Sequence, residues 1–421
     1  MTPQLKWPAA VSSTATFLFG SIALIAPTGY SWGPVLLVLG AALTYLWPNH
    51  RPSFPGREYI ALAAILLLFF IAAATEVLWH GLDPRAFDRP SRFIFALFVI
   101  PVLAHYPPKA RYLWLGFAVG AVGAGGWAIH QVFFEGMSRA QGETQTIQFG
   151  NIAMLMGLIS LVGFLWFQQL SRPNNFFKIL MLAGFAGGIT ASFLSGSRGG
   201  WLALPVGLVL TLYAYKFQLS AARSIGLIAL SIAVIAALSI APDTGVQKRL
   251  DRVFYETKEY FTEADATTSI GARLEMWKVA AKLGYQRPFL GWGSIQVEIE
   301  KVKLAETGRI DSAILQYSHA HNDFLDSWQK RGLLGLGALI ALYFVPLFFF
   351  MKKLTEGRPK TRPMALAGAL MCTSYIIFSL SQAFFEHNSG VMVYAFLLVT
   401  LWALCVASEK DDEQPSPYQA K

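Results

Sequence analysis

Charged residues are scarce in this chain. Asp, Glu, Lys and Arg together make up 14% of its 421 residues, whereas soluble domains average about 25%. Hydrophobic residues reach 54%, and they gather in continuous runs of about 20 residues, the length that an α-helix needs to cross a bilayer. Continuous rather than alternating hydrophobicity excludes a β-barrel. We therefore expect an all-α polytopic membrane protein.

Cysteine is also rare, and several other signals are missing. The two cysteines, Cys372 and Cys405, lie in apolar runs, so neither a disulfide framework nor a cysteine metal site is expected. No basic stripe interleaved with aromatics is visible, so the net charge of +9 does not indicate nucleic-acid binding. Neither an internal repeat nor a low-complexity domain stands out. The first apolar run lacks a clear small-residue cleavage site, so no cleavable signal peptide is predicted.

Apolar runs, punctuated by prolines and glycines, predict twelve membrane-spanning segments. The second, fourth and eighth are short for a perpendicular crossing. The segments are 10–26, 33–47, 59–79, 92–106, 111–134, 150–170, 176–196, 201–216, 223–241, 332–351, 363–386 and 390–408.

The distribution of lysine and arginine in the short loops predicts the orientation, because cytoplasmic loops carry an excess of both. With the N-terminus in the cytoplasm, most loop lysines and arginines fall on the cytoplasmic side. The largest group is Lys352, Lys353, Arg358, Lys360 and Arg362. This asymmetry predicts that both termini are cytoplasmic.

One polar loop divides the predicted spans. Residues 1–241 hold the first nine spans and 332–408 the last three, while 409–421 form a polar tail that we expect to be disordered. The loop, 242–331, carries thirteen basic and thirteen acidic residues, and by the span count it is periplasmic. Its aromatic content favours a folded, mostly helical segment. Within it, 271–284 places Leu274, Trp277, Val279, Ala281 and Leu283 mostly at helical spacing. This spacing suggests an amphipathic helix, which could cap the bundle or lie in the membrane interface.

Two histidines near the end of this loop are the best candidates for proton transfer. His319 and His321 stand beside Asn322, directly before an apolar run, and imidazole is the side chain best suited to move a proton near neutral pH. A structural role and metal binding are the alternatives, but no third metal ligand stands out nearby in sequence. Asp323 and Asp326 are expected to be solvated or helix-start carboxylates.

Three arginines fall on the same predicted face. Arg198 lies in the glycine-rich turn 194–201, Arg273 opens the predicted loop helix, and Arg139 precedes the sixth span. An arginine near a membrane often only snorkels to headgroups, and Arg273 could simply pair on a solvated helix. Guanidinium groups also bind phosphate oxygens in bidentate fashion. Together with a histidine base, they suit the displacement of a diphosphate leaving group.

Three stretches resemble the bacterial O-antigen ligase family, within the wider superfamily of O-antigen polymerases and ligases. They are SGSRGGWLAL at 195–204, GARLEMWKVAAKLGYQRPFLGWGS at 271–294 and SHAHNDFLDSWQKRGLLGLG at 318–337. In the last, His321 is followed by ten residues and then Gly332, as in the family. The hydropathy layout, with about twelve spans and one large late loop, is similar too.

The resemblance implies glycosyl transfer at the periplasmic face of the bacterial inner membrane. Family members take a glycan from undecaprenyl diphosphate and, in ligases, join it to a hydroxyl of the lipid A–core oligosaccharide, which completes lipopolysaccharide. The reaction is regarded as metal-independent and inverting, and no cofactor is implied. Carried onto this chain, the general base would be His321. The diphosphate-binding residues would be Arg198, Arg273 and Arg139, and the supporting residues His319 and Asn322.

Other functions remain open at this stage. An O-antigen polymerase shares the same loop plan, and a protein O-oligosaccharyltransferase belongs to the same superfamily but usually carries a longer C-terminal periplasmic region. A twelve-helix transporter or flippase is the more remote alternative. Transporters often show paired repeats and ionisable residues at mid-membrane, whereas the notable polar residues here cluster on one face.

Overall fold

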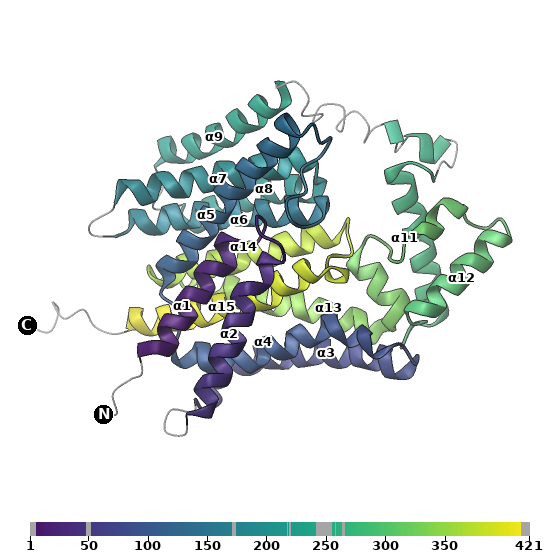
Figure 1. Cartoon of the computed structure of the whole chain (residues 1–421), viewed down its shortest axis with the longest axis horizontal. Coiled ribbons are helices and arrows are strands. Elements are labelled where there is room, and N and C mark those ends of the chain that lie inside the picture. The colour runs from purple at the N-terminus through teal and green to yellow at the C-terminus, as the bar shows by residue number, and fades with distance from the viewer. Residues whose placement is uncertain are drawn as a thin grey trace, which may run out of the picture.

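The chain forms a bundle of helices in the computed structural model (Figure 1). The structure describes residues 6–47, 52–170, 174–216, 218, 220–240, 255–256, 258–262 and 266–413. Within these residues every regular element is helical. The all-helical fold expected from the sequence is therefore confirmed.

The helices follow the predicted spans closely. The first nine are α1 (Lys6–Ser21), α2 (Gly29–Leu46), α3 (Ile60–Trp79), α4 (Asp88–His105), α5 (Ala110–Ile129), α6 (Thr146–Gln168), α7 (Asn175–Ser195), α8 (Arg198–Ala214) and α9 (Ala221–Ile240). The later ones are α11 (Ser269–Gln286), α12 (Ser294–Glu306), α13 (Asp323–Thr355), α14 (Thr361–Ser379) and α15 (Asn388–Glu413). Short turns of helix are η2 (Arg57–Tyr59), η3 (Pro84–Phe87), η4 (His130–Phe134), η5 (Ser312–Gln316) and η6 (Phe384–Glu386).

The length and hydropathy of these helices mark a membrane protein. Among the described residues, seven helices are long and apolar enough to cross a bilayer. They contain α2, α3, α5, α6, α7, α13 and α15, while α8 and α9 are apolar but shorter. Each of the twelve predicted segments coincides with a helix. The number of helices that actually cross the membrane stays a prediction.

Helices α6 and α15 form the centre of the bundle, because both are buried along almost their whole length. α6 packs against α5, α7, α8 and α14, and α15 packs against α4 and α14. Small residues allow the closest of these contacts. A methyl group added at Gly188 on α7 would lie 2.5 Å from the carbonyl oxygen of Ala153 on α6. The two helices therefore approach almost backbone to backbone.

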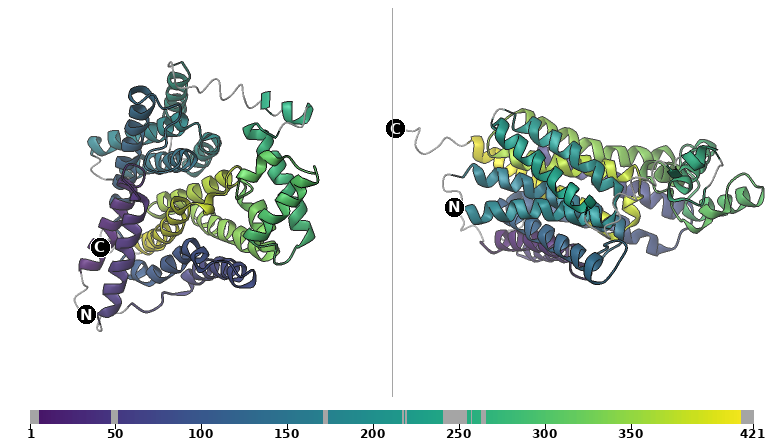
Figure 2. Two further views of the ribbon diagram at one scale, coloured as in Figure 1. Left: turned by 45° about the vertical axis from the view of Figure 1, so that its right-hand side comes forward. Right: turned by 90° about the horizontal axis from the view of Figure 1, so that it is seen from above.

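The predicted loop helix exists and caps the bundle. α11 packs against α13, and with α12 it lies at one end of the bundle, opposite the start of α1 and the end of α15 (Figures 1 and 2). Its buried face differs from the expected one, which included Leu274, Trp277 and Ala281 as well as Val279 and Leu283. The residues that enter the small core of this region are Ala272, Met276, Val279, Leu283, Val297 and Ile314. Val279 and Leu283 of the expected face are therefore part of this core, which α11 shares with α12 and η5, whereas Leu274, Trp277 and Ala281 are half-buried outside it.

Helix α13 begins nine residues before the predicted tenth span, and it is broken where that span was expected to start. Gly332 has φ 62° and ψ −156°, which interrupts the helix. Around this break the loop before α12 forms backbone hydrogen bonds with α13. The N–H of Leu333 donates to the carbonyl of Pro288 at 2.6 Å, and the N–H of Gly293 donates to the carbonyl of Lys330 at 2.9 Å. Gly332, the glycine that follows His321 after ten residues, thus lets the loop before α12 attach to α13.

Replacing Gly332 with alanine is expected to destabilise the protein. The backbone conformation is one that side chains rarely adopt, which alone costs about 1–3 kcal/mol, and the added methyl would lie 2.3 Å from the carbonyl oxygen of Phe289. Thermal unfolding in detergent should show a lower Tm. Gly337→Ala on the same helix is the matched control, because nothing lies within 4 Å of a methyl group there. Equal Tm values for the two variants would contradict the role assigned to the break.

Two boundaries in the C-terminal third differ from the prediction. α14 ends at Ser379 rather than at residue 386, and the segment that follows forms a loop with η6. α15 continues to Glu413, so the first residues of the tail expected to be disordered are helical. Their carboxylates explain this, because Asp412 accepts hydrogen bonds from Thr361 at 3.0 and 2.9 Å, and Glu409 pairs with Lys353 at 2.6 Å. The rest of the tail, 414–421, lies outside the described residues, as do residue 241 of the predicted ninth span and 242–254, 257 and 263–265 of the predicted loop.

Candidate active site

The three arginines singled out from the sequence line one pocket. Arg139 comes from the loop after η4, Arg198 is the first residue of α8, and Arg273 lies in the first turns of α11. This arginine pocket is a hollow of about 690 Å³, part of which is open to solvent, and it is also lined by Glu256 and Ser381. Residues separated by up to 134 positions in the sequence are therefore brought to one cavity with an excess of positive charge.

The turn before Arg198 is built by small residues. Gly196 has φ 68° and ends α7 in the left-handed conformation that glycine adopts without strain. The Ser197 hydroxyl donates to the Asn151 side-chain oxygen at 2.9 Å, and α8 begins at the next residue. A methyl group on Gly200 would lie 2.3 Å from the Ser192 hydroxyl oxygen. The glycines therefore allow the N-terminus of α8, which is favourable for an anion, to sit at the pocket.

Part of the Arg139 side chain forms hydrogen bonds with the backbone of this turn. Its Nε donates to the carbonyl of Ser195 at 2.7 Å, and an Nη donates to the carbonyl of Gly196 at 3.4 Å. Burial lowers the pKa of Arg139, and the nearby Arg198 lowers it further. Burial likewise lowers the pKa of Arg273, with additional repulsion from Arg198 and Arg139. Since an opposite charge favours the charged form, an anion in the pocket would relieve the repulsion.

The predicted supporting residue Asn322 starts α13. Its side-chain oxygen accepts hydrogen bonds from the N–H groups of Phe324 at 3.0 Å and Leu325 at 3.1 Å, and its amide donates to the carbonyl of Leu380 at 3.2 Å. The preceding residue, His321, has φ 49°, a left-handed conformation uncommon for a residue with a side chain. Such strain persists where the surroundings hold it, and it gathers at functional sites.

The imidazole of His321 contacts a polar side chain that the sequence analysis did not single out. Its Nδ1 lies in hydrogen-bond contact with the side-chain oxygen of Gln382, and the Gln382 amide nitrogen donates to Nε2 of His387 at 2.9 Å. Because an amide oxygen only accepts, Nδ1 of His321 carries the proton and Nε2 is the basic nitrogen. Gln382 and His387 thus select the tautomer of His321.

His319 lies against His321, with their ring centroids 4.3 Å apart. Burial, followed by repulsion from His319 and Arg273, lowers the pKa of His321 to about 3. Burial and repulsion from Lys330 lower the pKa of His319 to about 4. Both imidazoles are therefore neutral at physiological pH, the state in which a histidine can accept a proton. Removing the repulsion from Arg273 by binding an anion would raise the pKa of His321 and favour that transfer.

The arginine pocket and His321 adjoin each other. Ser381 lines the pocket, and the next residue, Gln382, is the partner of His321. The charge on Arg273 acts on His321 as well as on the other arginines. The site residues predicted from the sequence are thus brought together at one place.

Asp323 and Asp326 lie in the first turn of α13, which confirms the expected helix-start position, but both are buried rather than solvated. Asp323 is buried and accepts hydrogen bonds from the Ser379 hydroxyl at 2.7 Å and from the N–H of Phe384 at 3.0 Å. Asp326 pairs with Lys330 at 2.7 Å and accepts from the N–H of Ala320 at 2.9 Å. Their burial is tolerated because both carboxylates are hydrogen-bonded and Asp326 is also paired with a cation. Asp326 thus holds the loop that carries His319 and His321 against α13, and Asp323 holds the segment after α14 against it.

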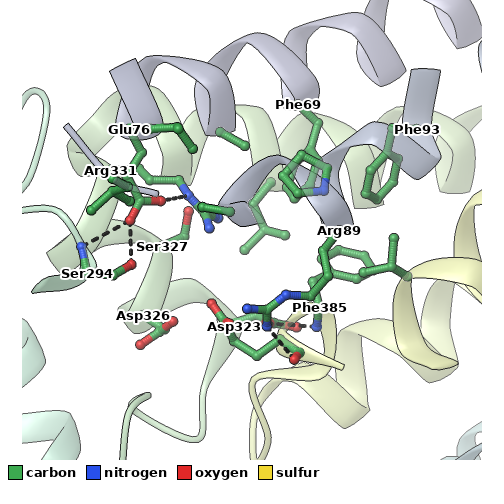
Figure 3. Close-up of a pocket in the computed structure, with 18 residues that line it drawn as sticks. Phe69, Glu76, Arg89, Phe93, Ser294, Asp323, Asp326, Ser327, Arg331 and Phe385 are labelled. Atoms are coloured by element: carbon green, nitrogen blue, oxygen red, sulfur yellow. Dashed lines mark hydrogen bonds and ion pairs between the residues drawn. The ribbon is translucent and has the colours of Figure 1, made fainter. Parts of the chain in front are cut away.

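Further ion pairs line a cavity next to these carboxylates, between α3, α4 and α13 (Figure 3). Arg331 Nε lies 2.5 Å from Glu76, which also accepts from the N–H of Ser294 at 3.0 Å. Across the cavity, Arg89 pairs with Glu386 of η6. Charged groups in the interior of a membrane protein are usually paired in this way. These pairs tie α3, α4 and the start of α12 to the elements that carry the site.

The missed residues, Gln382 and His387, had a weak signal in the sequence. Gln382 and Glu386 fall inside the predicted span 363–386, where polar side chains are unusual, and α14 in fact ends before them. Polar residues at the end of an apolar run could have marked the break. Among the described residues, no group of three His, Cys, Asp or Glu is arranged to hold a metal ion.

Comparison with known proteins agrees with this site. A family profile described as O-antigen ligase matches residues 183–340, a range that contains Arg198, Arg273 and His321 but not Arg139. An uncharacterized protein of Haemophilus influenzae is 30% identical over 380 residues, which cover 90% of this chain and 94% of that protein. An O-antigen ligase of Escherichia coli is 29% identical over 208 residues, 48% of this chain and 47% of that protein.

Proposed function

The chain belongs to the O-antigen ligase family, and on that premise we propose that it transfers a glycan from undecaprenyl diphosphate to a hydroxyl of the lipid A–core oligosaccharide, which completes lipopolysaccharide. The observation that carries the proposal is the arginine pocket beside His321. Within the described part of the chain, Arg139, Arg198 and Arg273 line it together with one carboxylate, Glu256. Such a charge balance suits the diphosphate of the donor, because guanidinium groups bind phosphate oxygens through paired hydrogen bonds.

In the proposed reaction, His321 is the general base. The oxygen of the acceptor hydroxyl attacks the anomeric carbon of the donor glycan, and Nε2 of His321 takes the hydroxyl proton. The bond between the anomeric carbon and the diphosphate oxygen breaks, and undecaprenyl diphosphate leaves with the electron pair. A single displacement of this kind inverts the configuration of the anomeric carbon.

The arginines act on the leaving group. Negative charge grows on the diphosphate as the bond breaks, and donors fixed in place beforehand stabilise it without reorganising. Arg198 and Arg273 hold the diphosphate, and Arg139, which is bound to the turn before α8, assists them. His319 packs against the base, and Asn322 fixes the start of α13 next to it. No metal takes part in the proposed step.

The proposed setting is the bacterial inner membrane with the site in the periplasm and both termini in the cytoplasm. Two observations support this orientation. The start of α1 and the end of α15 lie opposite the end of the bundle that carries α11 and α12 (Figure 1). The basic cluster of 352–362 connects α13 to α14 and forms ion pairs with the end of α15, as expected for a cytoplasmic loop.

Purified protein should transfer glycan to lipid A–core in preference to other acceptors. The test incubates the protein with a lipid-linked glycan and offers lipid A–core, a second lipid-linked glycan or an acceptor protein, each with and without a chelator. We expect a glycosylated lipid A–core band on a gel, unchanged by chelation.

The other outcomes are distinct. Elongated lipid-linked glycan would identify a polymerase, and a glycosylated protein would identify an oligosaccharyltransferase. Transfer to none of the acceptors would favour a transporter. Loss of activity on chelation, restored by one divalent ion, would overturn metal independence.

A further inference from the structure

A second pocket lies next to the proposed catalytic base and shares no lining residue with the arginine pocket. It is a hollow of about 910 Å³, part of which is open to solvent, between the start of α2, the loop before α6 and the start of α15. Residues that define it include Tyr30, Glu143, Gln145, Gln148, His387 and Asn388. We call it the Gln148 pocket.

Gln148 is the unusual residue of this pocket. It exposes only 1% of its surface, yet neither its side-chain nitrogen nor its side-chain oxygen has a hydrogen-bond partner among the residues that the structure describes. Buried polar groups are paired in the great majority of cases, and an unpaired one costs about 1–3 kcal/mol. An amide that offers both a donor and an acceptor at a polar cavity is suited to a ligand that carries both.

The charges around the pocket are mixed and largely paired. Arg89 forms an ion pair with Glu386, and Asp88 pairs with Arg92 at 2.5 Å. The remaining lining adds one charge of each sign, Arg85 and Glu143, and otherwise consists of amides, hydroxyls and His387. This differs from the arginine pocket, where the described lining has three arginines and one carboxylate. A diphosphate is therefore favoured in the arginine pocket, and a ligand with many hydroxyl groups in the Gln148 pocket.

The Gln148 pocket is connected to the base by two hydrogen bonds. His387 lines the pocket and accepts from Gln382 at 2.9 Å, and Gln382 contacts Nδ1 of His321. The ring of His387 also lies 6.0 Å from that of His319. The two pockets therefore flank the segment that holds the base, as a two-substrate reaction requires.

We propose that the Gln148 pocket binds the sugar of the acceptor glycan. Gln148 would bond to its hydroxyls and Tyr30 would supply an apolar face for the ring. This inference rests on the proposed function, because it takes one pocket for the donor and assigns the other to the acceptor.

The test measures acceptor binding directly as well as transfer. Lipid A–core without O-antigen is titrated against the full-length protein in detergent, and the KM values for donor and acceptor are measured in the transfer assay. Gln148→Leu removes both hydrogen-bonding groups and keeps most of the bulk, so the fold should tolerate it. Gln145→Ala, at an exposed position on the rim of the pocket, is a second variant whose folding is not in question. The matched control is Gln168→Leu, at the opposite end of the same helix.

For Gln148→Leu we expect Kd and KM for the acceptor to rise about tenfold, the loss of roughly one hydrogen bond. For Gln145→Ala a smaller rise is expected. The donor KM should stay unchanged in both, and Gln168→Leu should resemble the wild type. A rise in the donor KM instead would assign the pocket to the donor glycan and overturn the proposal. Unchanged acceptor binding in both pocket variants would also overturn it. So would a wild-type protein that does not bind lipid A–core. If binding weakens as expected but the wild type transfers no glycan, the acceptor site stands and the proposed reaction fails.

Discussion

Replacement of His321 with alanine is expected to lower the rate of glycan transfer by about 10²- to 10⁴-fold, the usual contribution of a general base. The structure supplies the reason for so large an effect. Contact of Nδ1 with the Gln382 oxygen leaves Nε2 as the basic nitrogen, and burial keeps the pKa of His321 low, at about 3, so the empty site holds a neutral base. Transfer by the purified variant, compared with wild type at equal amounts of folded protein, measures the effect.

The variant His321→Asn distinguishes the loss of a general base from a disturbance of the backbone conformation at position 321. Asparagine tolerates the left-handed conformation that His321 adopts, with φ 49°, but it cannot take the proton. We therefore expect His321→Asn to be as inactive as His321→Ala while its Tm stays close to that of the wild type. His130→Ala should remain active, because His130 is half-exposed and pairs with Glu135 at 3.0 Å outside the site. Recovery of transfer by the asparagine variant would assign His321 a structural role.

The fold was largely predictable because apolar runs and helices coincide in a membrane. All twelve predicted segments contain a helix, and most boundaries agree to within a few residues. The exceptions occur where polar contacts decide the boundary. Asn322 caps α13 well before the apolar run begins, and Asp412 extends α15 by bonding to Thr361 on α14. Contacts such as the one between Asp412 and Thr361 join residues that are distant in sequence, so the hydrophobic pattern of the sequence cannot predict them.

The site was predictable in part for a similar reason. Arg198, Arg273 and His321 lie in short stretches whose spacing is informative without the fold, and the structure brings them together with Arg139. Gln382 and Gln148 could not be assigned a role in advance. The importance of Gln382 comes from its contact with an imidazole 61 residues away. That of Gln148 comes from its burial without a hydrogen-bond partner in the described part of the chain. Both properties exist only in the folded chain.

Arg198→Lys is expected to reduce transfer by about 10²-fold, although the charge is kept. Loss of a single donor to a developing anion typically costs about 10²- to 10³-fold in rate, and lysine cannot supply the planar fork that binds two phosphate oxygens at once. Because the clamp acts most strongly as the leaving group gains charge, kcat should fall more than the donor KM rises. Arg139→Lys should have a smaller effect, since two of the Arg139 contacts are made to the backbone of the turn, at Ser195 and Gly196.

Steady-state kinetics with the lipid-linked donor, with Arg309→Lys as the control, provide the measurement. Arg309 is exposed and lies beyond α12, so the same substitution there should leave both constants unchanged. The comparison also distinguishes the two roles an arginine could have at this turn. If Arg198 only supported the start of α8, Arg198→Lys would lower the Tm and leave the kcat of the folded protein intact. A lower kcat at an unchanged Tm is what the diphosphate clamp requires, because only interactions stronger in the transition state than in the bound donor change kcat.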